Sequence, residues 1–161
     1  MHILGIILSA IFLVTSTSAQ ASCENSSVRV VENTVQTKAG KSLAFQLYDA
    51  AQKVPSGAWK TGEFNKETFT YLGDFKTHDR VLHVTFLETI WGASCRQTTR
   101  LMFWDKNHKL LGQYVGVEKP TMIANNTLLV PYEDQPDTQL IFNGHLPDCL
   151  NVANDCFPLE R

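Results

Sequence analysis

Carboxylates are the side chains of this chain best suited to acid–base chemistry. Glu88 falls inside a predicted strand, whereas Asp74 and Asp105 fall near predicted strand ends. Two carboxylates that face each other across a cleft can hydrolyse a glycosidic bond. A strand glutamate is more often held by a neighbour, here Thr99 or Arg100. A small glycan-active hydrolase is therefore an alternative interpretation and not the leading one.

Nucleophilic catalysis has weaker support in the sequence. The segment from Trp91 to Cys95 contains a serine in a turn, but it lacks the G-x-S-x-G spacing of a nucleophile elbow. The histidines at positions 78, 83, 108 and 145 are scattered along the chain, and no pattern brings one of them to a serine. We therefore expect no serine or cysteine nucleophile and consider catalysis the less favoured function.

Metal-ligating residues are concentrated only in the stretch from Asp148 to Cys156. This stretch lacks the ligand spacing of a helix-loop-helix calcium site, and the chain has no C-x-x-C pair for zinc. We predict no metal site and no cofactor, and interpret the stretch as a capped loop closed by a disulfide.

The four cysteines allow three pairings, and the sequence alone does not choose among them. Proximity along the chain favours a Cys149–Cys156 bond. A Cys23–Cys95 bond would then tie the start of the processed chain to the middle of the domain.

The first 21 residues predict a cleaved signal peptide, because the apolar run Ile3–Val14 is followed by small residues ending Ala19-Gln20-Ala21. A membrane anchor is the competing interpretation, but a run of this length is short for a bilayer span. We expect residues 22–161 to form a single disulfide-stabilised domain in the periplasm or the extracellular medium, where cysteines can oxidise.

The charge pattern argues against nucleic acid as a partner. The formal net charge is −2, and acidic and basic residues are interspersed without a basic block. No further apolar stretch predicts a membrane span after the signal peptide.

Strand-like runs bounded by turn residues recur every eight to twelve positions from Thr68 onward, which is typical of an antiparallel sheet. We predict a mainly β fold, an antiparallel meander that forms a single sandwich or a partly open barrel. The predicted strands are Thr68–Asp74, Val81–Trp91, Thr98–Trp104, Leu110–Val117, Thr127–Tyr132 and Gln139–Phe142, with a further strand at Val28–Val31.

One segment, Ser42–Val54, fits a helical face and also, in its first half, a strand face. The alanine-rich sequence around Asp49 favours a short helix, ended by Pro55-Ser56-Gly57.

The hairpin Val81–Trp91/Thr98–Trp104 carries the main binding hypothesis. Pairing Val84 with Phe103 and Phe86 with Leu101 assembles one apolar face. The second face then carries His83, Trp91, Arg100, Met102 and Trp104. A slip of one residue would instead place Glu88 opposite Arg100.

Two interpretations of this second face remain open. In one, a helix or a second sheet covers it, and its tryptophans belong to the core. In the other it is an exposed recognition surface, since Trp, Met and Arg are enriched at protein interfaces.

We therefore expect an exported, non-catalytic binding module that recognises or inhibits a protein of the cell envelope or extracellular space. A carrier that closes its sheet around a small apolar ligand is the first alternative. No motif of exported hydrolases, lipocalin-type carriers, lysozyme inhibitors or redox domains can be traced residue by residue.

Overall fold

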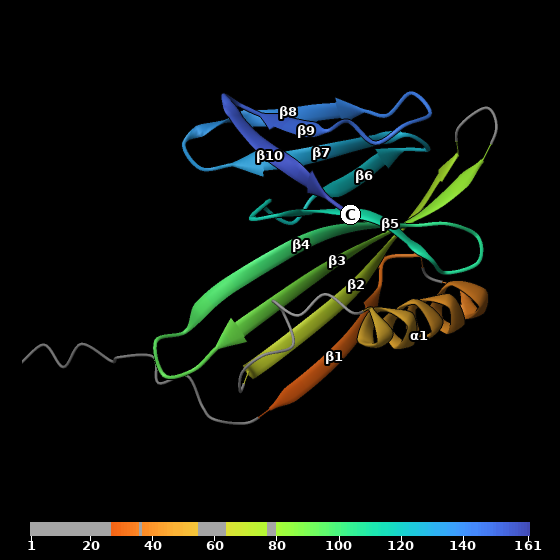
Figure 1. The fold of residues 1–161 in the computed structure, drawn as a ribbon, viewed down its shortest axis with the longest axis vertical. Coiled ribbons are helices and arrows are strands. Elements are labelled where there is room, and N and C mark those ends of the chain that lie inside the picture. Colours follow the sequence, from red (N-terminus) through yellow and green to blue (C-terminus); the bar gives the residue numbers. More distant parts are fainter. Residues whose placement is uncertain (1–26, 36, 55–63, 77–79) are drawn as a thin grey trace, which may run out of the picture.

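Two β-sheets and one helix make up the described part of the chain. The computed structural model describes residues 27–35, 37–54, 64–76 and 80–161. A seven-stranded sheet has the order β1-β2-β3-β4-β5-β10-β9, and a three-stranded sheet has the order β6-β7-β8. The sheets are not closed into a barrel and are consistent with a β-sandwich (Figure 1). The predicted mainly β fold with one helix is confirmed.

Every predicted strand has a counterpart in the structure, and several are longer than predicted, whereas β5 ends two residues earlier. The strands are β1 Val28–Asn33, β2 Phe64–Lys76, β3 Val81–Trp91, β4 Arg96–Trp104, β5 Leu110–Val115, β6 Thr121–Ala124, β7 Thr127–Tyr132, β8 Gln135–Ile141, β9 Cys149–Val152 and β10 Asp155–Glu160. Three of these, β6, β9 and β10, are absent from the sequence prediction, because β6 and β9 have four residues each and Pro158 interrupts the pattern of β10.

The first two strands depart from the predicted meander. β1 pairs with β2 in parallel, with Val28 opposite Lys66 and Asn33 opposite Tyr71. Adjacent parallel strands need a crossover connection, and helix α1 (Lys38–Lys53) lies within it. The antiparallel order holds from β2 to β5, and β10 then returns to pair with β5.

Helix α1 begins four residues before the predicted start. Thr37 caps it, because its hydroxyl oxygen accepts the Gly40 backbone N–H at 3.0 Å. A Cβ on Gly40 would lie 2.8 Å from the Val35 carbonyl oxygen, so the chain needs glycine at this close approach. Because glycine has a low helix propensity, the first helical turn was not predicted from the sequence. The predicted end at residues 55–57 lies outside the described residues.

The C-terminal stretch is a β-hairpin and not the predicted loop. β9 and β10 are antiparallel, with Cys156 opposite Asn151, and a disulfide joins Cys149 to Cys156 with a Cα–Cα distance of 5.4 Å. This pairing agrees with the prediction. Cys95 is also disulfide-bonded, while Cys23 of the predicted Cys23–Cys95 pair lies outside the described residues, as does the predicted signal peptide.

The face of the large sheet toward β6–β8 is packed mainly by apolar side chains. Phe103 contacts Phe75, Tyr114 and Phe142, with ring centroids 5.3–5.9 Å apart. We call this group the sandwich core; its buried members are Leu72, Phe75, Leu82, Val84, Phe86, Leu101, Phe103, Tyr114, Val117, Leu128, Val130, Phe142, Leu150 and Val152. The register that pairs Val84 with Phe103 and Phe86 with Leu101 is confirmed.

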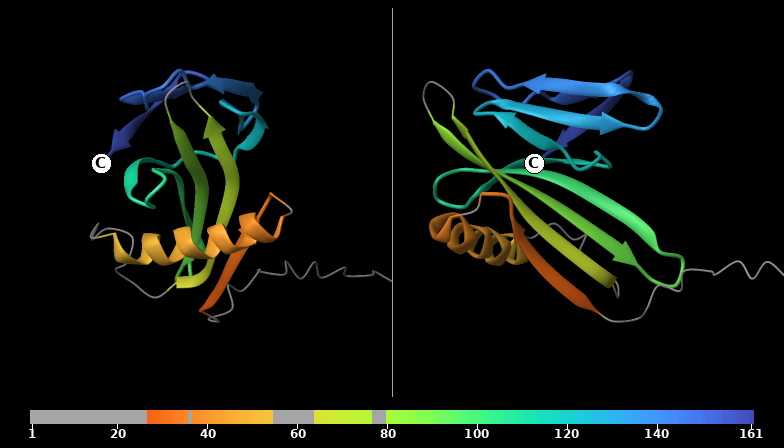
Figure 2. Two further views of the ribbon diagram at one scale, coloured as in Figure 1. Left: turned by 90° about the vertical axis from the view of Figure 1, so that its right-hand side faces the viewer. Right: turned by 180° about the vertical axis from the view of Figure 1, so that it is seen from behind.

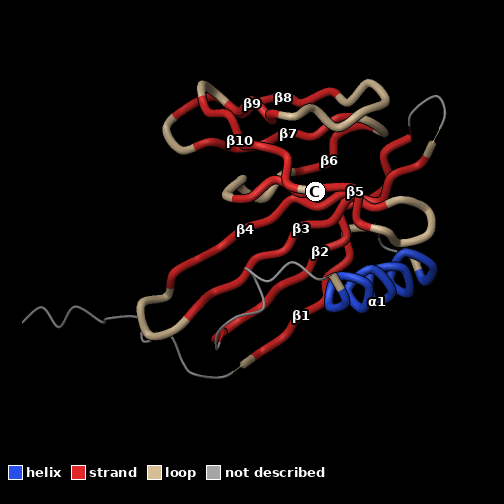
Figure 3. Tube along the Cα trace, in the orientation of Figure 1, coloured by secondary structure: helices blue, strands red, loops and turns tan. Residues whose placement is uncertain are grey.

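Helix α1 lies against β1 and β2 on the opposite face of the large sheet, and a second cluster on this face joins its side chains to those of β2–β4 (Figure 2). Helical residues Ala44, Leu47 and Ala51 share one face at intervals of three and four. We call this group the helix-side core; its buried members are Ala44, Leu47, Ala51, Phe69, Tyr71, Leu87, Met102 and Trp104. Among the described residues, α1 is the one helix available to cover this face (Figure 3).

Candidate functional site

A groove of about 620 Å³ lies where three parts of the chain meet: the end of β2, the connection from β1 to α1, and strand β6 with the residues before it. Concave sites that combine apolar walls with a few polar groups are the usual form of a ligand site. The lining residues are Thr34, Val35, Tyr71, Leu72, Gly73, Asp74, Lys76, Lys119, Pro120, Thr121, Met122 and Asn125.

A β-bulge between Tyr71 and Gly73 shapes this groove. In a regular strand, residues three apart point to opposite faces. The bulge inserts one residue, so Asp74 lies on the same face as Tyr71, and the Tyr71 hydroxyl donates to Asp74 Oδ1 at 2.5 Å. Gly73 has a φ of 141°, and a Cβ there would lie 2.9 Å from Met122 Sδ.

The same aspartate pairs with a histidine of the neighbouring strand. His83 Nδ1 lies 2.6 Å from Asp74 Oδ1, and the rings of His83 and His108 are 5.9 Å apart. Burial raises the pKa of Tyr71, and its hydrogen bond to Asp74 raises it further. Tyr71 therefore remains protonated at neutral pH and acts as a fixed donor to the carboxylate.

Two lysines and several apolar side chains complete the groove. Lys119 Nζ donates to Glu32 Oε2 at 3.2 Å, and the Lys76 backbone N–H donates to the Asn125 carbonyl oxygen at 2.7 Å. The apolar lining residues are Val35, Leu72, Pro120 and Met122. The groove thus offers apolar contacts, the exposed Lys76 and the ion-paired Lys119 beside one internally bonded carboxylate.

Three residues of the predicted binding face are buried. Met102 and Trp104 are 0% exposed and belong to the helix-side core, and Arg100 is 7% exposed. The exposed-surface interpretation does not hold for these three residues, because Met102 and Trp104 are enclosed in the helix-side core, and Arg100 lies within 3.7 Å of Glu160. Burial lowers the pKa of Arg100, and the charge of Glu160 opposes this shift.

The other two predicted residues lie at opposite ends of β3. Trp91 is half-buried near the tip of the β3–β4 hairpin, where its Nε1–H donates to the Thr98 hydroxyl at 3.1 Å. His83 lies beside the groove through its contact with Asp74. The structure therefore does not bring the five predicted residues into one surface.

The carboxylates considered for hydrolysis do not face each other. Asp74 contacts His83 on the helix side, whereas Glu88 is offset by one position from Leu87 and points to the other side of the sheet. Asp105 Oδ1 accepts the backbone N–H groups of Asn107 and Lys109 and shapes the β4–β5 turn. No two of these three carboxylates face each other, as the hydrolase alternative would require.

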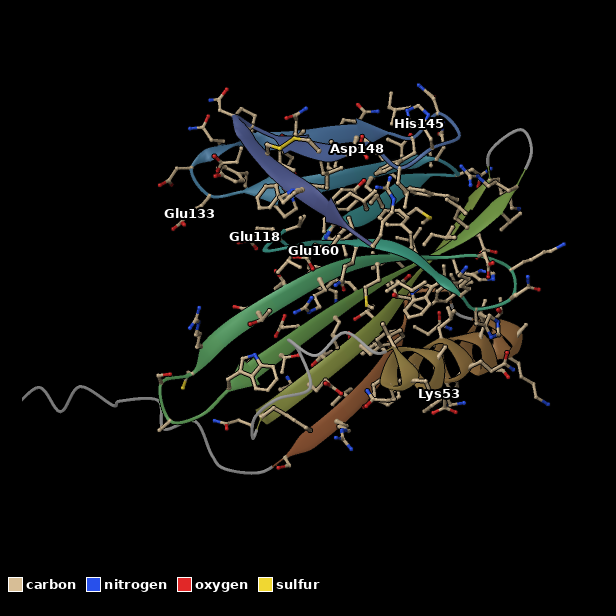
Figure 4. All side chains as sticks on the ribbon, viewed as in Figure 1. Lys53, Glu118, Glu133, His145, Asp148 and Glu160 are labelled. Carbon is tan, nitrogen blue, oxygen red and sulfur yellow. A yellow bond between two sulfur atoms is a disulfide. The ribbon has the colours of Figure 1, made fainter. Side chains whose placement is uncertain are left out.

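Acidic and basic residues are less evenly interspersed along the chain than expected. Residues 22–115 contain twelve Lys/Arg and nine Asp/Glu, whereas residues 116–161 contain two and seven. Figure 4 shows Glu118, Glu133, Asp148 and Glu160 in this C-terminal part. Four acidic residues also line a second groove of about 460 Å³, together with Tyr132 and Phe157. Within the described ranges, no group of three His, Cys, Asp or Glu residues could hold a metal ion.

Comparisons with known proteins add no assignment. No family model matches this chain, and no match to it is found among curated proteins or solved structures. In the part of the chain that the structure describes, no helix is long and apolar enough to cross a membrane.

Sequence reasoning missed the groove, although one signal for it was present. A glycine inside a strand pattern indicates a bulge, and Gly73 interrupts the β2 pattern in this way. Lys119, Thr121 and Met122 carried no comparable signal, because only the folding of β6 against the end of β2 brings them to the groove.

Proposed function

We propose that this protein is an exported, non-catalytic binding module that recognises or inhibits a protein of the cell envelope or the extracellular space. The observation that carries the proposal is the groove between β2 and β6, which combines apolar walls with polar groups from three separate segments. The Cys149–Cys156 disulfide suits an oxidising compartment outside the cytosol.

Binding is favoured over catalysis by the residues that line the groove, which include one carboxylate and neither serine nor cysteine. Asp74 Oδ1 already interacts with both Tyr71 and His83, which are its neighbours in the same sheet. A carboxylate held by two partners is well suited to fix the shape of a site, because its hydrogen-bonding capacity is partly used within the protein.

The carrier alternative has less support from the packing. A β-sheet carrier holds its ligand inside a closed or strongly cupped sheet, whereas here the sheets are not closed into a barrel. The inner face of the large sheet is filled by side chains of the sandwich core such as Phe75 and Phe142, whose rings are 5.0 Å apart.

The experiment that tests the proposal blocks the groove with one large side chain. Thr121 is exposed on β6 and lines the groove, so Thr121→Trp fills it without altering either core. Gln139→Trp is the matched control, because Gln139 is exposed on β8 and does not line the groove.

Wild type and both variants are immobilised in oxidised form and exposed to envelope and secreted extracts of the producing cell. Any protein that is retained is purified, and its dissociation constant is measured by calorimetry. We expect wild type and Gln139→Trp to bind it alike and Thr121→Trp to lose binding. Equal binding by all three proteins, or by none, would contradict the proposal.

A further inference from the structure

The edge of β2 on which β1 lies is open beyond Leu72. β1 pairs with β2 in parallel only as far as Asn33 and Tyr71. The next residue, Thr34, closes this ladder: its N–H donates to the Tyr71 carbonyl oxygen at 3.0 Å, and its hydroxyl donates to the Leu72 carbonyl oxygen at 2.7 Å. The chain then turns away from β2, and the Val35 N–H donates to Asn33 Oδ1 at 2.8 Å. The last part of β2 continues without β1 beside it.

The backbone of Asp74 faces this open edge. In an antiparallel ladder, residues opposite each other alternate between hydrogen-bonded and non-hydrogen-bonded pairs. The Lys76 N–H donates to the Asn125 carbonyl oxygen at 2.7 Å, so Lys76 and its partner Val81 on β3 form a non-hydrogen-bonded pair. Asp74 and His83, two positions along the same ladder, form the next pair of this type. The N–H and C=O of Asp74 therefore both point away from β3.

These two backbone groups open into the groove. Asp74 lines the groove, and within the described ranges no hydrogen bond to its N–H or C=O is formed on this side. Its side chain is engaged separately, by Tyr71 and His83. A strand residue that presents both an N–H and a C=O can exchange two hydrogen bonds with one residue of an added strand.

The other wall of the groove is also a strand edge. β6 is an outer strand of the three-stranded sheet, and its consecutive residues Thr121 and Met122 both line the groove. Since consecutive side chains of a strand point to opposite faces, it is the edge of β6 that borders the groove. A hydrogen bond from Lys76 to Asn125 joins the two edges at one end, and a Cβ on Gly73 would lie 2.9 Å from the Met122 sulfur. The groove thus lies between two strand edges, one from each sheet.

We propose that the groove binds an extended segment of a partner protein, which adds as a short strand beside Asp74 on the β2 edge that β1 leaves open. This inference rests on the proposed function and specifies how the partner is held. The Asp74 N–H and C=O bond one backbone residue of the segment, and Val35 and Met122 contact its side chains. In strand addition, main-chain hydrogen bonds supply affinity, whereas pockets for alternate side chains supply specificity.

Amide hydrogen exchange of the free protein tests the open edge. By the alternation along β2, Phe75 and Leu82 form a hydrogen-bonded pair. We expect the Asp74 amide to exchange at least about a hundredfold faster than the Phe75 amide. Equal protection of the two amides would overturn the inference, because the edge of Asp74 would already be paired, within the molecule or with a second copy.

A peptide probe tests strand addition itself. Acetyl-Thr-Val-Leu-Val-Thr-amide is titrated into ¹⁵N-labelled protein and followed by NMR, beside an analogue with N-methyl groups on its leucine and both valines. The analogue keeps the side chains but loses three backbone donors. We expect the parent peptide to slow exchange at Asp74 and to shift the amides of residues 72–76 and 119–122. The analogue should bind at least about tenfold more weakly.

The two tryptophan variants supply the matched controls. Thr121→Trp should lose the response to the parent peptide, whereas Gln139→Trp should respond as wild type does, and the spectrum of each variant reports whether it is folded. Equal binding of both peptides at these amides would overturn strand addition while leaving the groove as a binding site. No response to the parent peptide at millimolar concentration would also overturn it. The Thr121→Trp comparison with cell extracts then decides separately whether the groove binds any partner.

Discussion

The two faces of the long strands β2–β4 are packed in different ways. The sandwich core contains apolar side chains together with Tyr114, and the small polar Thr70 of β2 is buried on the same face. On the helix side, polar residues such as Glu67, Thr85 and Arg100 are buried beside apolar ones. The same strands thus take part in two cores. The sandwich core is mainly apolar, whereas the helix-side core also holds buried polar side chains in fixed orientations. The groove lies where they meet, since Tyr71 belongs to the helix-side core and Leu72 to the sandwich core.

The largest effect is expected in the sandwich core. Phe103 is 0% exposed and contacts three aromatic rings. Phe103→Ala removes these contacts and leaves a cavity, so we expect a loss of about 3–5 kcal/mol in the free energy of unfolding. Urea unfolding followed by tryptophan fluorescence measures it. A loss below about 1 kcal/mol would mean that this face is loosely packed.

The second-largest loss of stability is expected at the bulge in β2, which lies between the two cores. Gly73→Ala places a Cβ at a φ of 141° and 2.9 Å from Met122 Sδ, so we expect a loss of about 1–3 kcal/mol. The change also moves the β2 backbone that carries Tyr71 and Asp74. Thermal unfolding measures the loss, and Gly92→Ala is the control, because Gly92 also has a positive φ, 56°, but lies at a hairpin tip with open space around it. Equal effects of the two substitutions would show that the contact with Met122 contributes nothing.

Two tryptophan hydrogen bonds allow the stability cost of losing a buried acceptor to be compared with that of losing a partly exposed one. Trp104 Nε1–H donates to the Thr85 hydroxyl at 2.8 Å, with both residues 0% exposed. Thr85→Val leaves a buried N–H without its acceptor, at a cost of about 1–3 kcal/mol. Thr98→Val removes the corresponding acceptor of half-buried Trp91, where water can replace it, so we expect a smaller loss. Chemical unfolding of both variants tests this order, and the reverse order would contradict it.

The smallest effect concerns acid stability at the groove rim. The pKa of Glu32 is lowered in the folded protein, chiefly by the hydrogen bond from Lys119. Its stabilising contribution is therefore present at neutral pH and is lost as the pH falls through the lowered folded value. Glu32→Gln should lose less stability than wild type between neutral pH and pH ~3. Urea midpoints at both pH values measure this, and identical pH dependence would show that the ion pair does not contribute to folding.

Much of the fold could be predicted from the sequence, because alternation and turn residues are local signals. The bounds of β3 and β7 and the pairing of β3 with β4 agree with the prediction. The parallel pairing of β1 with β2 and the return of β10 to β5 could not be predicted, since each joins segments far apart in the chain.

The candidate site was harder to predict for the same reason. Alternation correctly assigned Met102 and Trp104 to one face, but it does not say what covers that face. In the structure both residues are buried in the helix-side core, which also contains the apolar face of α1. The groove depends on a bulge and on a contact between two sheets, and neither leaves a periodic pattern in the sequence.

The most direct test of the groove as the binding site is site-specific photo-crosslinking in the producing cell. A benzoylphenylalanine is introduced at position 121, inside the groove, or at position 139, on the same small sheet but outside it. The account predicts one strong crosslinked adduct with a partner protein from position 121 and none from position 139. An adduct of equal strength at both positions, or only at position 139, would contradict it.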